Sequence, residues 1–170
     1  MQVKKLAAIK CDGFITWSIM PDKEKITEKI MKYCAWRDRC TQEVLRKLTE
    51  LGASEKLTQN LIQQLKEEKF LNDHRFAISY ARGKLANNQW GRIKIMYALR
   101  AFQIDKEYIE EALAGLDNDL YDETLERLVQ KKLRALKTGK YHEKYQKVFT
   151  YLSSKGFESD RIRETVNKQL

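Results

Sequence analysis

Residues 73–104 read DHRFAISYARGKLANNQWGRIKIMYALRAFQI, and this stretch decides the fold that we expect. Its apolar residues recur at helical spacing: Phe76, Tyr80, Ile95, Leu99 and Phe102. That spacing places them along the faces of two amphipathic α-helices. The helices are expected to meet near Trp90–Gly91, because glycine interrupts a helical pattern.

The same stretch is strongly basic. After Asp73 it contains no acidic residue until Asp105. Its basic residues are Arg75, Arg82, Lys84, Arg92, Lys94 and Arg100. Such an unbalanced run indicates a positive surface with a negatively charged partner. The alternative is that these long side chains only solvate a helix pair.

The composition of the whole chain agrees with a polyanionic partner. Lys and Arg number 33 against 24 Asp and Glu in 170 residues, which gives a net charge of +9 and a pI near 9.4. Nucleic acid is the usual partner of such a chain, and an anionic membrane surface is the competing one. One Pro and seven Gly favour helices over a loop-rich β fold.

Cysteines and hydropathy bear on the cellular compartment. The three cysteines are odd in number and share no metal-ligand spacing, so they indicate a reducing compartment and small buried side chains. No apolar run is long enough to span a bilayer, and Lys10 interrupts the apolar segment that follows Lys4-Lys5. We expect a cytoplasmic protein without a membrane partner.

An internal repeat organises the chain from about residue 22. A shift of 51 residues places Val44 on Ile95, Leu48 on Leu99 and Ser54 on Asp105. A second shift, of 54 residues, gives these further pairs: Asp105 with Ser159, Tyr108 with Ile162, and Leu116 with Leu170. Each unit carries three helical patterns, so the sequence predicts three tandem three-helix repeats.

The predicted fold is all-α. The domains are an N-terminal segment and three repeats: residues 1–22, 23–72, 73–117 and 118–170. Asp12-Gly13 followed by alternating apolar residues predicts either a short β-hairpin in residues 1–22 or an arm. Because neighbouring repeats touch mainly in sequence order, we expect an elongated, curved, monomeric array.

Charge also changes sign along the later repeats. Residues 105–126 contain nine acidic residues and one basic residue, Lys106. The charged residues of 127–157 are instead Lys and Arg, with Glu143 as the single acidic residue. Three residues of the acidic zone are candidates for a protein contact: Asp117, Asp119 and Asp122. The alternative is that the two zones neutralise each other between adjacent repeats.

The search for catalytic chemistry finds little. His74 and His142 lie in different repeats without a partner at catalytic spacing, and Gly83-Lys84 lacks the flanking residues of a phosphate-binding loop. We therefore predict a non-enzymatic protein without a cofactor or metal. The candidate DNA- or filament-binding residues are Arg75, Arg82, Lys84, Arg92, Lys94, Arg100, Lys131, Lys132 and Arg134. Trp90 either stacks an unpaired base or belongs to the core at a helix junction.

The repeats resemble those of the RecX family, the bacterial modulators of the RecA recombinase, over roughly residues 26–170. The first unit carries Tyr33, Ala35, Arg37, Thr41, Leu45, Lys47, Leu48 and Gly52. The middle unit carries Asp73, Arg75, Phe76, Ala77, Trp90, Gly91, Lys94, Ile95, Leu99, Arg100 and Ile104. The last unit carries Lys131, Lys132, Tyr151, Leu152, Lys155, Gly156, Phe157, Asp160 and Ile162. Gln103 departs from the family pattern, which has Gly there, and residues 1–25 match nothing diagnostic.

The resemblance implies a regulator that binds the RecA–DNA filament, binds single- and double-stranded DNA by itself, and inhibits the recombinase, ATPase and coprotease activities of RecA. Such a protein modulates DNA repair, homologous recombination and the SOS response. Two other classes fit the residues alone. One is a stand-alone helical DNA-binding module such as a transcription regulator, and the other is a helical scaffold without a nucleic-acid partner.

Overall fold

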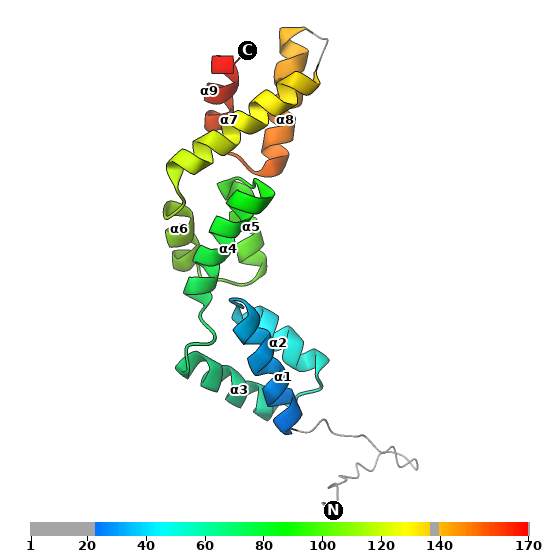
Figure 1. Ribbon diagram of the computed structural model, residues 1–170, viewed down its shortest axis with the longest axis vertical. Helices are drawn as coiled ribbons and strands as arrows, with labels where there is room; N and C mark the ends of the chain where they lie inside the picture. The colour runs from blue at the N-terminus through cyan, green and yellow to red at the C-terminus, as the bar shows by residue number, and fades with distance from the viewer. Residues whose placement is uncertain (1–22, 137–139, 170) are drawn as a thin grey trace, which may run out of the picture. The chain divides into compact units, whose positions relative to one another are not determined.

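The computed structural model describes residues 23–136 and 140–169, and within these ranges it contains nine α-helices and no β-strand. The predicted all-α class is confirmed. The predicted N-terminal hairpin or arm lies outside the described residues. The chain divides between Asn72 and Asp73 into two units, one with helices α1–α3 and one with α4–α9 (Figure 1).

The first unit packs three helices around one small core. Its helices are α1 (Lys23–Trp36), α2 (Thr41–Glu50) and α3 (Glu55–Glu67). Apolar side chains four residues apart, such as Ile26 and Ile30 on α1 or Leu61 and Leu65 on α3, enter this core. Cys34 and Cys40 are also buried, as predicted, and burial raises the pKa of the Cys34 thiol.

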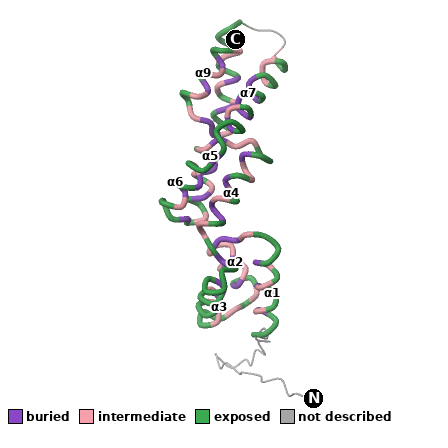
Figure 2. Tube along the Cα trace, turned by 60° about the vertical axis from the view of Figure 1, so that its left-hand side comes forward, coloured by how far each residue is buried: buried purple, intermediate pink, exposed green. Residues whose placement is uncertain are grey.

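The second unit contains two further sets of three helices. Its helices are α4 (Asp73–Asn88), α5 (Arg92–Ala101), α6 (Lys106–Ala114), α7 (Asn118–Ala135), α8 (Tyr141–Lys155) and α9 (Ser159–Gln169). In the middle set, Phe76 and Tyr80 of α4 meet the ring of Phe102 edge-on, with centroids 5.5 Å apart in both pairs. Buried positions recur along each helix, separated by exposed ones, as Figure 2 shows. The three predicted three-helix repeats are thereby confirmed.

The middle helix of every repeat ends in the same way. A residue in the left-handed region follows α2, α5 and α8, with φ of 72° at Gly52, 55° at Gln103 and 86° at Gly156. The next amide then donates to a leucine carbonyl five residues back, as in Ala53 to Leu48 and Phe157 to Leu152. Glycine adopts this conformation without a steric cost, whereas a side chain does not, so Gln103 is the strained member.

These helix ends correct the second repeat shift, which is 53 residues and not 54. Gln103 corresponds to Gly156, and Leu99 corresponds to Leu152. The first turns agree, because Ile109 donates to the carbonyl of Asp105 as Ile162 donates to that of Glu158. Pairing Asp105 with Ser159 matched two residues that resemble helix caps, although α9 already begins at Ser159.

In the described part of the chain, no helix combines the length and the hydropathy needed to cross a bilayer.

Candidate nucleic-acid interface

Several basic residues around α2 in the first unit are paired with acidic neighbours. Glu43 accepts from Arg37 at 2.7 Å and from Arg39 at 3.3 Å through the same oxygen, Oε1. The Arg39 side chain is only 6% exposed, and its guanidinium also lies 3.8 Å from the centroid of the Tyr33 ring. One turn further along α2, Lys47 pairs with Glu50 at 2.8 Å. These charges therefore neutralise one another within the fold.

The surface of α4 and α5 differs because acidic residues are missing between Asp73 and Asp105. Arg75, Arg82 and Arg100 are exposed, and Lys84 and Lys94 are half-buried. Within the described ranges, Arg82, Lys84, Lys94 and Arg100 form no ion pair; the salt bridges found there involve other residues. This surface keeps its positive charge available to an anion.

Trp90 lies at the turn between α4 and α5 and is half-buried. The Lys84 ammonium is 4.8 Å from the centroid of its ring, and the Lys94 ammonium is 4.9 Å away. Both distances fit cation–π contacts, which hold the two lysines beside the ring. A nucleobase that stacked on Trp90 would have to compete with these ammonium groups.

Arg92 has internal partners that compete with a phosphate. Its guanidinium donates to Asn118 at 2.8 Å and to Glu158 at 3.3 Å. It also lies 4.1 Å from the centroid of the Tyr121 ring. These contacts join α5 to the first turn of α7 and to the residue that precedes α9, so Arg92 holds two repeats together.

Tyr121 completes this junction, although the sequence analysis did not identify it. Its hydroxyl donates to Glu158 Oε2 at 2.5 Å and accepts from the backbone amide of Arg92 at 3.2 Å. Burial, followed by the hydrogen bond to Glu158, raises the pKa of the Tyr121 phenol well above its usual range. Its place on the buried stripe with Leu125 and Leu128 is the signal in the sequence, but that stripe does not reveal a partner 37 residues away.

Two glycines bring the backbones of the middle and last repeats into contact. The amide of Gly91 donates to the carbonyl of Lys155 at 2.9 Å, and the amide of Ile93 donates to that of Gly156 at 3.0 Å. A Cβ atom on Gly91 would lie 2.2 Å from the Gly156 oxygen, which no folded protein tolerates without a backbone shift. The first turn of α5 thus obtains acceptors from the end of α8, and the positive end of the α5 dipole meets the negative end of the α8 dipole.

Lysine side chains also bond across this contact between the two repeats. Lys94 donates to the carbonyl of Ser154 at 3.2 Å, and Lys155 donates to that of Asn88 at 3.4 Å. On the same helix as Lys155, the Tyr151 ring lies 5.1 Å from the Lys132 ammonium. Lys132 is therefore connected to the Trp90 region through α8, whereas Lys131 and Arg134 are exposed on α7 without a described ion-pair partner.

The acidic candidates are partly engaged in the fold. Asp117 accepts from the amide of Leu120 at 3.1 Å and caps α7, and Asp122 pairs with Arg161 at 2.6 Å. Asp119 is exposed in the first turn of α7. Only Asp119 therefore keeps a carboxylate without a described internal role.

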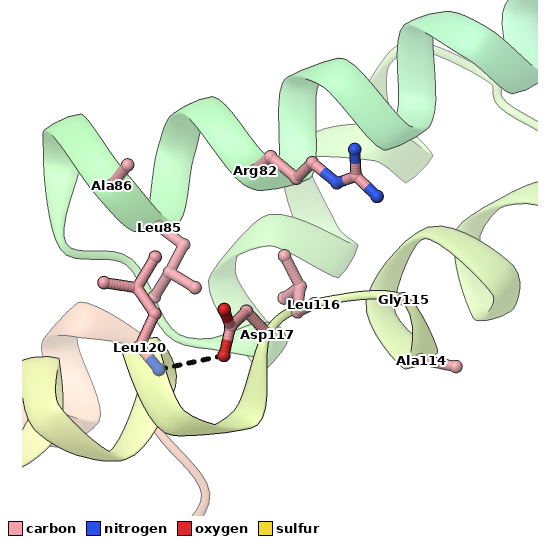
Figure 3. Close-up of a pocket in the computed structure, with 8 residues that line it drawn as sticks. All are labelled: Arg82, Leu85, Ala86, Ala114, Gly115, Leu116, Asp117 and Leu120. Atoms are coloured by element: carbon pink, nitrogen blue, oxygen red, sulfur yellow. Dashed lines mark hydrogen bonds between the residues drawn. The ribbon is translucent and has the colours of Figure 1, made fainter.

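A hollow of about 600 Å³ lies between α4 and the segment that joins α6 to α7. Figure 3 shows Leu85 projecting from α4 toward Leu116 and Leu120 on the opposite segment, while the Arg82 guanidinium extends along α4 away from Asp117. Arg82 and Asp117 are its only ionisable lining residues. The described residues also include no group of three His, Cys, Asp or Glu side chains that could hold a metal ion.

Comparisons with known proteins agree on one family. Residues 72–113 match the model of the second three-helix domain of RecX, and residues 119–166 match that of the third. The regulatory protein RecX of Clostridium tetani is 31% identical over 164 residues, which are 95% of this chain and 68% of the relative. That of Clostridium perfringens (strain SM101 / Type A) is 35% identical over 132 residues, or 75% of this chain.

A crystal structure of RecX from Lactobacillus salivarius superimposes with a TM-score of 0.77 at 26% identity, covering 86% of this chain and 95% of that one. The matched segment spans 61% of the length of the Clostridium perfringens relative.

Proposed function

The chain belongs to the RecX family of regulatory proteins, and from that premise we propose that it is a non-catalytic regulator of the RecA–DNA filament. In this proposal it binds the filament, inhibits the ATPase, strand-exchange and coprotease activities of RecA, and so modulates DNA repair and the SOS response. The observation that carries the proposal is the acid-free surface of α4 and α5 in a chain of this family.

The chemistry of that surface supports a polymeric anion. Arg82 and Arg100 are exposed, and Lys84 and Lys94 lie between them in sequence without a described carboxylate partner. Arg and Lys bind the phosphates of any sequence, so these residues give affinity and orientation rather than base recognition. Four to six such contacts predict a log–log salt slope of about −4 to −5 for duplex DNA.

Inhibition follows from occupancy of the filament. A helical protein that lies along the groove blocks a second DNA strand. If the regulator binds an inactive state of the filament more tightly than the active state, this difference in affinity also shifts the filament toward the inactive state. No bond is made or broken by the regulator itself.

The test is ATP hydrolysis by RecA on single-stranded DNA, followed as phosphate release while the regulator is added. We expect hydrolysis to fall to a low plateau with the wild-type chain. The variant Arg82→Glu/Lys94→Glu/Arg100→Glu should inhibit much less, whereas Lys106→Glu, on the acidic helix α6, should inhibit like the wild type. Arg92 is left unchanged because of its internal contacts.

The second candidate is a stand-alone DNA-binding module, which the same basic surface favours. If RecA hydrolysis is unchanged at saturating protein while bare DNA is still bound with a salt-sensitive affinity, the stand-alone module is correct and the regulator is not. If neither effect is seen, both proposals fail.

A further inference from the structure

Cations and aromatic rings alternate around the junction of the last two repeats. From α4 to α8 the contacts run from Tyr80 to Lys84, from Lys84 to Trp90, and from Trp90 to Lys94. Lys94 then reaches Ser154, beside Lys155, and Lys155 reaches back to Asn88 at the end of α4. We name Lys84, Trp90, Lys94 and Lys155 the lysine–tryptophan cluster.

Two ammonium groups therefore lie beside the Trp90 ring, and a third, that of Lys155, bonds nearby to the end of α4 at Asn88. The described residues place no opposing carboxylate against these three lysines. The nearest acidic residue in sequence, Glu158, is already engaged with Arg92 and Tyr121. Like charges repel at such short range, and the negative ends of α4 and α8 offset this repulsion only in part.

Each ammonium in the cluster also keeps donors to spare. An ammonium carries three N–H donors, and the described bonds of Lys94 and Lys155 each use one of them, to a backbone carbonyl. Among the residues that the structure describes, the Lys84 ammonium contacts only the rings of Tyr80 and Trp90. Lys84, Lys94 and Lys155 are all partly exposed, so an anion from solvent can reach them.

We propose that the lysine–tryptophan cluster is a phosphate site, shared by the middle and last repeats, that binds a backbone phosphate of a single-stranded nucleic acid. Lys84, Lys94 and Lys155 donate to the phosphate oxygens, and the Trp90 ring positions two of the lysines rather than stacking a base. This inference rests on the nucleic-acid contact of the proposed function but not on RecA. A compact point charge is suited to a single phosphate, which explains why all three donors are lysines.

A strand is favoured over a free phosphate ion because the cations continue beyond the cluster. Lys132 contacts Tyr151, one turn before Lys155 on α8. A neighbouring phosphate of the same strand can meet Lys132, whereas an isolated ion cannot.

Trp90 supplies the readout. In the variant Trp17→Phe/Trp36→Phe it is the remaining tryptophan, since the sequence contains three. Three probes are titrated separately: a thymidine oligonucleotide, an abasic phosphodiester strand of equal length, and inorganic phosphate. We expect both strands to change Trp90 emission at similar concentrations, and inorganic phosphate to do so only at concentrations at least a hundredfold higher.

Matched triple variants test the lysines. In the same background, Lys84→Gln/Lys94→Gln/Lys155→Gln should bind the oligonucleotide about tenfold more weakly and lower the salt slope by about 2, since each single-strand contact contributes about 0.7. The control Lys140→Gln/Lys144→Gln/Lys147→Gln removes the same charge from the start of α8 and the residue that precedes it, and it should change the slope by less than about 1. Circular dichroism and thermal melting establish whether both triple variants fold. If one of them does not fold, the Trp90 titration of the protein with all its lysines intact still tests the site.

Three results would overturn the inference. Emission that responds to the oligonucleotide but not to the abasic strand would mean that Trp90 stacks a base. Saturation by inorganic phosphate without competition from the strand would mean a free-ion site. Equal affinities and slopes for the two triple variants would mean that the cluster is not a contact. RecA inhibition that fails while the Trp90 response persists would remove the proposed function and leave the phosphate site intact.

Discussion

Helices α2 and α5 occupy the same place in successive repeats, yet the arginines beside α2 are paired with a carboxylate, whereas the cations of α5 that face solvent are not. Their core positions correspond, because Val44 and Leu48 on α2 are fully buried, as are Ile95 and Leu99 on α5. The same shift of 51 residues places Glu43 on Lys94. Glu43 binds two arginines of its own unit, whereas Lys94 has no described carboxylate. The apolar positions determine the fold. The charged residues between them determine whether the cations of a surface are paired within the protein or available to bind an anion.

The largest expected effect on stability comes from removing the negative charge of Glu43, which pairs with two arginines beside α2. Glu43→Gln removes the carboxylate that pairs with the buried Arg39 guanidinium and leaves it only neutral partners, among them the carbonyl and the ring of Tyr33. We expect the free energy of unfolding of the first unit to fall by about 3 kcal/mol. Urea unfolding of the full chain, followed by circular dichroism, measures the change. Glu110→Gln is the control, because both side chains of the Lys106–Glu110 ion pair are exposed to solvent and the loss of this pair should cost little stability. Equal effects of the two variants would mean that Arg39 does not depend on Glu43.

The next comparison concerns the glycines that end α2 and α8. Both have positive φ, but a Cβ on Gly156 would also lie 2.3 Å from the Cβ of Lys94. We expect Gly156→Ala to lower stability by about 3 kcal/mol, and Gly52→Ala by about 1 kcal/mol, the conformational cost of a left-handed alanine. Thermal unfolding of both variants measures the difference. Gly83→Ala has open space around it in α4 and should stabilise by up to about 1 kcal/mol.

A third variant gives α5 the charge of α2. Lys94→Glu introduces at position 94 the residue type of Glu43, and we expect the affinity for single-stranded DNA at low salt to fall about tenfold, since one attraction is replaced by a repulsion. Fluorescence anisotropy of a labelled oligonucleotide measures it. Lys106→Glu makes the same charge change on α6 and should have a smaller effect. Similar losses in both variants would point to net charge rather than to the surface of α4 and α5.

The smallest expected effect exchanges the residues that end α2 and α5. Gln103→Gly relieves a left-handed side chain and should raise stability by about 1 kcal/mol, partly offset by the flexibility of glycine in the unfolded chain. The reciprocal Gly52→Gln should lower stability by a similar amount. Melting temperatures of the two variants decide the matter, and a loss of stability in Gln103→Gly would show that the Gln103 side chain makes a favourable contact.

Much of the fold could be predicted from the sequence because the core positions repeat. Leu48, Leu99 and Leu152 each lie on a regular apolar stripe and each accept the hydrogen bond that ends their helix. Periodicity reports the buried face of a helix directly, so the helices and their grouping in threes follow from it.

The contacts of the candidate site could not be predicted in the same way. Arg92 appears in the sequence as one more cation of a basic run, but its partner Glu158 lies 66 residues away. The cations beside Trp90 include one, Lys94, that also reaches α8, and nothing in the local pattern indicates that α8 ends there. Pairing across repeats depends on how helices pack, which local composition does not record.

The contact between Gly91 and Gly156 also determines how the chain can be divided. The amides of Gly91 and Ile93 find their acceptors on Lys155 and Gly156. In a polypeptide that ended at Leu116, these amides would lack their acceptors and the apolar surface that packs against the last repeat would be exposed to solvent. We therefore expect such a fragment to aggregate or to unfold. After Asn72, the smallest fragment expected to fold autonomously is thus a pair of repeats, and limited proteolysis should release it as one piece.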